Sequence, residues 1–171
     1  MNLLEEIKNS KKKPKELVAY LTEEIKKDKT LFGQLIEGLT GGSDVERGTC
    51  ADLLKHVTKD RPEYALPYLE AIIAHITYKA PRVKWGTQEA IANISPKFPQ
   101  KVELAIPSLL VNTRDQSTVV RWCAAYALTE IAKSNPKTRN TLVPKFRDFV
   151  EKEKNSGVRN VYLKVFKVIN K

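Results

Sequence analysis

The sequence predicts an all-α protein assembled from a row of antiparallel helix pairs. Two observations support this class. Apolar residues recur at helical spacing along most of the 171 residues, and the whole pattern then repeats at a fixed interval. No segment alternates apolar and polar residues over the length that a β-strand requires.

The repeat interval is marked most clearly by prolines. Pro62, Pro99 and Pro136 each close a polar stretch, and 37 residues separate each from the next. Three apolar columns keep the same interval: Phe32, Leu69, Ile106 and Val143; Leu35, Ile72, Leu109 and Phe146; and Leu54, Ile91 and Leu128. A period shared by three apolar columns and one proline column indicates repeated structural units.

The apolar spacing within each unit is helical. In EYALPYLEAIIAHI the large apolar residues fall on one helix face, at Leu69, Ile72, Ile73 and Ile76. We therefore expect two helices in each unit. The expected helices span 2–9, 14–27, 29–40, 44–59, 63–77, 81–95, 100–113, 117–134, 138–153 and 157–170.

The segment GGSD at 41–44 is a suitable turn between two of these helices. Its glycines tolerate backbone conformations that other residues avoid, and Ser43 or Asp44 can cap the helix that follows. Gly86 is expected inside a helix, where glycine lowers helix propensity. Its presence indicates that this helix approaches a neighbour closely.

One segment carries the pattern of a known repeat family. IPSLLVNTRDQSTVVRWCAAYALTEIAKSNP has Pro107 early in its first helix, Asp115 in the turn, and Arg121 early in the second helix before Ala124, Leu128 and Ile131. It resembles a HEAT repeat. The resemblance implies a right-handed α-solenoid of about four to five antiparallel helix-pair (HEAT-like) repeats. It also implies that the second helices line the concave side, and that the protein binds proteins or nucleic acids.

The repeat boundaries expected on this basis form a single domain over 1–171. Residues 1–27 are an N-terminal cap or partial repeat, and the repeats span 28–59, 62–98, 99–135 and 136–171.

The formal net charge of +10 is confined to one half of the chain. Residues 1–79 contain 13 basic and 13 acidic residues, whereas residues 80–171 contain 17 basic and 7 acidic residues. The C-terminal half is therefore expected to attract an acidic partner.

Several other classes of protein find no support in the sequence. No apolar run is long enough to cross a bilayer, and the N-terminus lacks the order of charges seen in a secretory signal. Cys50 and Cys123 have no metal-ligand spacing with His56 or His75, so we expect free thiols, a cytoplasmic location, and no metal or cofactor. Cys123 lies in a core column and is expected to be buried.

A basic residue occupies the same position in each repeat: Arg47, Lys84, Arg121 and Arg159. The HEAT resemblance implies that this residue ties repeats together through an acid six residues earlier. Asp115 stands six residues before Arg121, and Glu153 stands six residues before Arg159. Arg47 and Lys84 have no acid at that spacing, which leaves structural and binding roles open for them.

The next position in the repeat holds Trp85 and Trp122, which lie off the apolar stripe on adjacent repeats. Large aromatic residues at such a position either pack between repeats or form platforms on the concave face. As platforms they would lie beside the basic residues and beside Tyr126 and Lys164, an arrangement suited to gripping a peptide or stacking on bases.

The function expected from these observations is that of a non-catalytic binding or adaptor module for a protein partner, which the charge suggests is acidic. The candidate binding residues are Lys84, Trp85, Arg121, Trp122, Tyr126, Arg159 and Lys164. The alternative is a nucleic-acid-binding protein, because some HEAT-like proteins resemble alkylpurine DNA glycosylases that use Trp and Asp side chains. No catalytic set or phosphate-binding loop is evident.

Overall fold

The computed structural model describes residues 1–170, which contain helices and no strand. The helices fall into two rows. The A row consists of α1 (Leu3–Asn9), α3 (Thr30–Gly41), η1 (Pro62–Tyr68) with α5 (Leu69–Ala74), η2 (Lys101–Ala105) with α7 (Ile106–Asn112), and α9 (Pro136–Lys152). The B row consists of α2 (Pro14–Lys27), α4 (Asp44–Asp60), α6 (Pro81–Ile94), α8 (Thr118–Ser134) and α10 (Ser156–Ile169).

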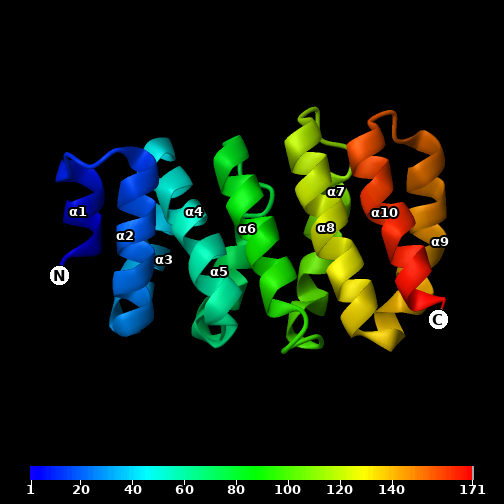
Figure 1. Ribbon diagram of the computed structural model, residues 1–171, viewed down its shortest axis with the longest axis horizontal. Helices are drawn as coiled ribbons and strands as arrows, with labels where there is room; N and C mark the ends of the chain where they lie inside the picture. Colours follow the sequence, from blue (N-terminus) through cyan, green and yellow to red (C-terminus); the bar gives the residue numbers. More distant parts are fainter. Residues whose placement is uncertain (171) are drawn as a thin grey trace.

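The helix pairs stand side by side along the long axis of the molecule, with the two ends of the chain at opposite ends of the row (Figure 1). Each B helix packs on the next B helix, from α2 through α4, α6 and α8 to α10. Contacts between successive A helices are far fewer, so the B row forms the continuous layer. The predicted all-α solenoid is confirmed.

Side-chain caps explain where several helices begin. The Ser43 hydroxyl accepts a hydrogen bond from the Glu46 N–H, while the Glu46 carboxylate accepts one from the Ser43 N–H, which forms a capping box at the start of α4. Of the two caps considered for the GGSD turn, Ser43 is therefore the one used. The side-chain oxygens of Ser117, Asn135 and Asn155 accept backbone N–H groups in the first turns of α8, α9 and α10.

Two A helices differ from the prediction of continuous helices over 63–77 and 100–113. Each begins as a tighter 3₁₀ segment and becomes α-helical only for its second part, at α5 and α7. Pro67 lies inside η1, and Pro107 lies in the first turn of α7. Proline has no N–H for the helical ladder and clashes with the preceding turn, so an α-helix cannot run through either position undisturbed.

The apolar columns form the core in the predicted register. Two columns are completely buried along the row: Leu35, Ile72, Leu109 and Phe146; and Leu54, Ile91 and Leu128. The third column is buried at Phe32 and Leu69 but only half-buried at Ile106 and Val143. Packing at this position therefore loosens toward the C-terminal repeats.

Gly86 marks the closest approach between two B helices. A Cβ atom at this position would overlap the carbonyl oxygen of Ala51 on α4 and would lie 2.7 Å from the Ala51 Cβ. Gly86 therefore lets α6 pack directly against the backbone of α4. Within the described part of the chain, no helix combines the length and apolar character needed to cross a membrane.

Candidate partner-binding surface

The four basic residues of the repeated position form a series of contacts that we call the inter-repeat ladder. Lys84 donates to the Asp115 carboxylate in the next repeat at 2.6 Å. Arg121 likewise reaches the next repeat, donating from Nε and Nη2 to the two carboxylate oxygens of Glu153 at 3.0 and 3.2 Å. Each of these two basic side chains thus holds an acid that lies in the turn of the following repeat.

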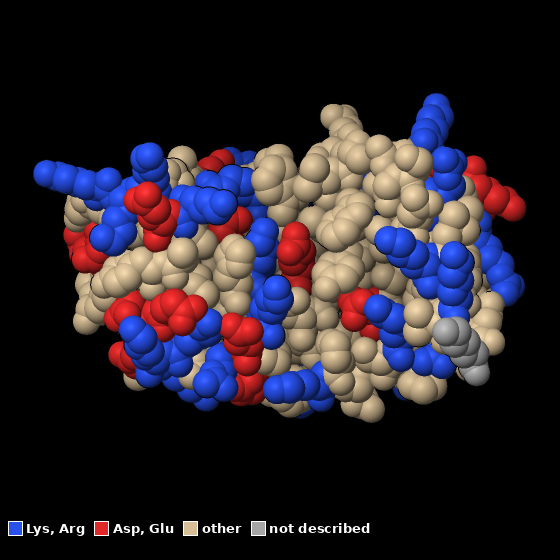
Figure 2. Space-filling view, in the orientation of Figure 1, with Lys and Arg blue, Asp and Glu red and all other residues tan. Residues whose placement is uncertain are grey.

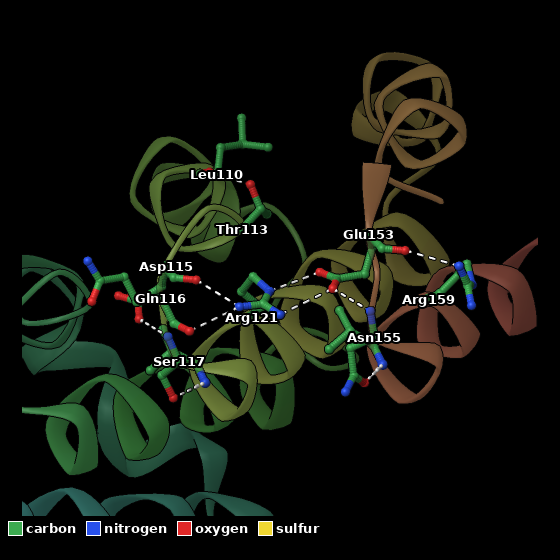
Figure 3. Close-up of polar contacts among 11 residues, drawn as sticks. Leu110, Thr113, Asp115, Gln116, Ser117, Arg121, Glu153, Asn155 and Arg159 are labelled. Atoms are coloured by element: carbon green, nitrogen blue, oxygen red, sulfur yellow. Dashed lines mark hydrogen bonds and ion pairs between the residues drawn. The ribbon is translucent and has the colours of Figure 1, made fainter. Parts of the chain in front are cut away.

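The expected pairing of Arg121 with the Asp115 carboxylate is therefore wrong. Arg121 Nη1 donates instead to the backbone carbonyl oxygens of Asp115 and Gln116, at 3.0 and 3.2 Å (Figure 3). Arg159 repeats this geometry with the carbonyl oxygen of Glu153 at 3.1 Å. The backbone carbonyl oxygen of Asp115 therefore accepts from Arg121 of its own repeat, while its carboxylate accepts from Lys84 of the preceding repeat. Glu153 is used in the same way by Arg159 and Arg121.

The first member of the ladder uses an aromatic ring in place of an acid. Arg47 donates to the carbonyl oxygens of Leu39 and Gly42, and its guanidinium lies 4.8 Å from the ring centroid of Tyr78 in the next repeat. Tyr78 stands 37 residues before Asp115. The missing acid at this position is therefore replaced by a cation–π contact.

The ladder acids remain ionised because their partners outweigh the effect of burial. Burial raises the pKa of Asp115, but hydrogen bonds from Lys84 and from the Ser117 N–H leave that pKa below its usual value. Burial similarly raises the pKa of Glu153, and hydrogen bonds from Arg121 and the Asn155 N–H lower it further than burial raises it. Both carboxylate oxygens of Asp115 are engaged, one by Lys84 and the other by the Ser117 N–H.

A cavity of about 580 Å³ lies over this part of the ladder, between the α7–α8 turn and the α9–α10 turn. Its inner surface includes Asp115, Arg121 and Glu153, whose charges compensate one another within the molecule. Phe149 and Tyr162 complete the floor. Asp148 and Lys152 at its edge also pair with each other, whereas Arg114 and Lys154 line the cavity without an ion pair to any described residue.

The two tryptophans have different surroundings. Trp85 is half-buried, and its indole Nε1 is buried without a hydrogen-bond partner. Trp122 is 39% exposed, and its ring stacks on that of Tyr126 one turn later, with centroids 5.4 Å apart and planes 25° apart. Each ring limits the freedom of the other, so the pair presents a rigid aromatic surface.

This aromatic pair forms one wall of a groove of about 260 Å³ between two B helices, which we call the α8–α10 groove. Trp122, Tyr126 and Lys164, three of the seven predicted binding residues, come together there. The other lining residues are Thr129, Glu130 and Lys133 from α8, and Val161, Val165 and Val168 from α10. Val168 is 55% exposed and forms part of the rim.

The remaining predicted residues lie elsewhere. Lys84, Arg121 and Arg159 belong to the inter-repeat ladder, and Trp85 lies one helix away on α6. Sequence reasoning missed Lys133 and the three valines. Lys133 stands 11 residues after Trp122, which is about three turns at 3.6 residues per turn, so helical spacing could have placed it on the same face as Trp122.

Charges on the B face are distributed unevenly. Arg82 on α6 pairs with Asp52 on α4 at 2.6 Å, and Lys55 on α4 lies 3.9 Å from Glu89 on α6. The charges of these four side chains therefore compensate one another. Figure 2 shows this mixture of positive and negative charge from the N-terminal end as far as α6, an uncharged band between α6 and α8, and mainly positive charge over α10. The groove lies where the uncharged band meets the positive end.

The two cysteines are buried and free, as predicted. Burial, followed by the charge of Glu89 and a contact with its carboxylate, raises the pKa of Cys123 to about 12. Burial also raises the pKa of Cys50 to about 12, with a smaller effect from Glu46. Thiols in this state are poor nucleophiles. Residues 1–170 contain no cluster of three or more His, Cys, Asp or Glu side chains placed to hold a metal ion.

Comparison with known proteins identifies the fold. No protein-family model matches the chain, and no curated protein matches it. A designed armadillo repeat protein in complex with the peptide (KR)4 is similar in structure, with a TM-score of 0.71 and 15% identity over 96% of this chain and 79% of that one.

Two further solved structures give the same result. An engineered protein has a TM-score of 0.70 and 16% identity, covering 96% of this chain and 78% of its own. Designed armadillo repeat proteins for modular peptide recognition have a TM-score of 0.67 and 15% identity, covering 96% and 79%. The chain therefore has the fold of an armadillo-like repeat solenoid.

Proposed function

We propose that this chain is a non-catalytic module that binds an acidic protein partner along its B face, which we take to be the concave side of the solenoid. The observation that carries the proposal is the α8–α10 groove, where the exposed Trp122 stacks on the half-buried Tyr126 beside Lys133 and Lys164. Exposed aromatic residues within a depression are typical of interface hot spots. One designed protein of similar fold is in complex with the peptide (KR)4, and others are designed for modular peptide recognition, which supports a peptide segment as the ligand here.

The seven candidate residues take different parts in this proposal. Trp122 and Tyr126 contact the partner directly, and Lys164 attracts its acidic groups. Lys84 and Arg121 contribute mainly by holding successive repeats in register, whereas Arg159 fixes the turn within its own repeat through the Glu153 carbonyl oxygen. Trp85 lies on α6, one helix away from the groove, and does not line it.

The repeats that build this surface are proposed to be HEAT-like pairs over 28–59, 62–98, 99–135 and 136–171, with 1–27 as a cap. Two helices per unit and the ladder contact from one unit to the next support this division. We also propose that the protein acts in the cytoplasm, where two buried free thiols are compatible with the reducing environment.

A peptide selection tests the proposed function. Random peptides displayed on phage are selected on the immobilised protein, and the enriched peptides are then measured by fluorescence anisotropy. We expect enrichment of acidic peptides. Replacing Trp122 by Ala should weaken their binding by about 30-fold, the effect of losing roughly 2 kcal/mol at a hot spot.

The matched control is Tyr20→Ala, which removes an aromatic side chain of similar exposure from α2. This change should leave peptide affinity unaltered, and circular dichroism should show that both variants remain folded. A nucleic-acid function predicts a different result. Oligonucleotides would bind with an affinity that falls steeply with salt concentration, and no peptide would be enriched.

A further inference from the structure

We infer that the α8–α10 groove recognises a two-part motif in its partner: one large apolar side chain next to a carboxylate, carried by a short extended segment. This inference rests on the proposed function and specifies the ligand of that site. It follows from the apolar walls of the groove, from its volume, from the position of Lys164, and from a comparison with the equivalent region between α4 and α6.

The walls of the groove suit an apolar side chain. On one side is the stacked pair of Trp122 and Tyr126, and on the other are the branched side chains of Val161, Val165 and Val168. Burial of an apolar group between such surfaces removes water from both. An aromatic or branched aliphatic side chain would therefore bind there more favourably than a polar one.

The volume limits the occupant to about one side chain. Sites that enclose small-molecule ligands usually measure about 300–1,000 Å³, whereas this groove measures about 260 Å³. It is also open along one side, because Trp122 and Val168 remain partly exposed at its rim. A groove of this size and shape suits a single anchor residue whose main chain stays outside.

The positive charge at the rim favours an acidic residue next to that anchor in the bound segment. Lys133 is paired with Glu130 on its own helix. Lys164 has no ion pair with any described residue and is exposed at the groove. Because successive residues of an extended chain lie about 3.3 Å apart, a carboxylate one or two residues from the anchor can reach the Lys164 ammonium group.

The equivalent region between α4 and α6 explains why recognition is confined to α8 and α10. There, Glu89 on α6 lies near Lys55, and Asn93 donates to the Lys55 carbonyl oxygen at 2.9 Å. These contacts join the two helices across the space between them. The residues 75 positions after Glu89 and Asn93 are Lys164 and Val168.

These replacements remove the bridging contacts. Thr129 stands 74 residues after Lys55. The positions of the Lys55–Glu89 pair are therefore occupied by Thr129 and Lys164 between α8 and α10, and these two cannot form an ion pair. Valine at 168 cannot donate a hydrogen bond as Asn93 does. No such contact therefore bridges α8 and α10 at the groove, and Lys164 has no acidic partner there.

Three synthetic peptides test this inference. They share one Gly/Ser-rich sequence and differ only at a central site that holds Phe-Asp-Asp, Ala-Asp-Asp or Phe-Lys-Lys. Affinities are measured by fluorescence anisotropy with the full chain. We expect the Phe-Asp-Asp peptide to bind at least about tenfold more tightly than either of the others, since burial of a large apolar side chain and a charge contact each contribute on this scale.

Variants of the protein locate the site. Val168→Phe fills the groove from its rim and should lower affinity for the Phe-Asp-Asp peptide by about tenfold or more. Val45→Phe makes the same change at an exposed position on α4 and should have no effect. Lys164→Glu should favour the Phe-Lys-Lys peptide, whereas Lys145→Glu on α9 should not.

The possible failures are distinguishable. If peptides selected without bias bind the protein but ignore Val168→Phe and Lys164→Glu, the inference about the groove is overturned and the proposed function stands. If the Ala-Asp-Asp peptide binds as tightly as the Phe-Asp-Asp peptide, attraction of charge alone is at work and the inference is again overturned. If no selected peptide binds, the proposed function itself fails.

Discussion

The carboxylate of Glu153 shows how much one side chain contributes to the array. It lies in the turn before α10, is 9% exposed, and accepts both hydrogen bonds of the Arg121 pair. It also accepts a hydrogen bond from the Asn155 N–H at 3.0 Å. The last repeat is therefore attached to the one before it by a charged contact that is largely shielded from water.

Replacing Glu153 by Gln should destabilise the protein by about 1.5–3 kcal/mol at pH 7, the range for lost hydrogen bonds to charged groups. The folded-state pKa of Glu153 lies below its usual value, so the stability that its charge contributes is present above the unfolded pKa and is lost as pH falls through the folded pKa. Urea unfolding should show a difference between wild type and variant at pH 7 that shrinks below about pH 4.

Glu151→Gln on the exposed surface of α9 is the matched control and should change stability by less than about 0.5 kcal/mol. An undiminished difference between wild type and Glu153→Gln at pH 3 would show that the Glu153 charge is not the source of the effect.

Cys123 supplies a second prediction at this scale. With the pKa of its thiol raised to about 12, only about one molecule in 10⁴ carries the thiolate at pH 8. Neither Cys123 nor Cys50 should react with iodoacetamide in the native protein within an hour, whereas both should react in 6 M guanidinium chloride. Mass spectrometry gives the number of modified thiols, and rapid native labelling would contradict the buried placement.

At the scale of the elements, α4 and α6 have the most extensive contact between neighbouring helices of the B row. It depends on Gly86, because the Ala51 backbone occupies the space that a Cβ would need. On helix propensity alone, Ala would be favoured over Gly by about 1 kcal/mol. The steric effect opposes this gain and should exceed it.

We therefore expect Gly86→Ala to lower the free energy of unfolding by roughly 1–3 kcal/mol, as overpacking usually does. Gly41→Ala is the control, since a Cβ there meets no atom within 4 Å. That change should be neutral or slightly stabilising. Thermal or urea unfolding of both variants measures the difference, and a stable Gly86→Ala protein would mean that α4 and α6 can separate without cost.

The elements also show what sequence patterns predict well. Buried columns such as Leu35, Ile72 and Leu109 repeat with the period of the fold, so their spacing predicts the helices, their pairing and the core. The 3₁₀ segments η1 and η2 lie at Pro67 and just before Pro107, whereas α9 runs through Pro144 as a continuous α-helix. Helical periodicity does not contain that information.

Predicting the site was harder for a related reason. The partner of Arg121 could not be found by looking for an acid nearby in sequence, because the Glu153 carboxylate comes from the next repeat. Trp122 and Trp85 occupy equivalent positions, yet they differ in exposure. That difference depends on residues of the neighbouring repeats, and it emerges only when the helices are packed together.

For the molecule as a whole, the uneven charge should govern how quickly an acidic partner arrives. Residues 80–171 carry the entire net charge of +10. Long-range attraction increases association rates and is screened as salt concentration rises. The C-terminal end of the B face should therefore be the first part of the protein that such a partner meets.

This predicts a salt-dependent association rate for the acidic peptides described above. In stopped-flow measurements, raising the salt concentration from 50 to 500 mM should slow association by about tenfold or more, with a smaller change in dissociation. Replacing Lys164 and Lys167 by Gln should reduce this dependence. The same exchange at Lys11 and Lys12, in the half with no net charge, should reduce it much less.

The inter-repeat ladder couples the local dynamics of each repeat to those of its neighbour. When α9 and α10 open, the Arg121 guanidinium loses its carboxylate and keeps only backbone carbonyl oxygens. Fraying at this end therefore weakens the repeat before it, as nearest-neighbour coupling in a one-dimensional array requires. Opening of α10 should therefore increase amide hydrogen exchange in α8. The exchange rate of the helix that carries Trp122 and Tyr126 would then report whether the α8–α10 groove is formed.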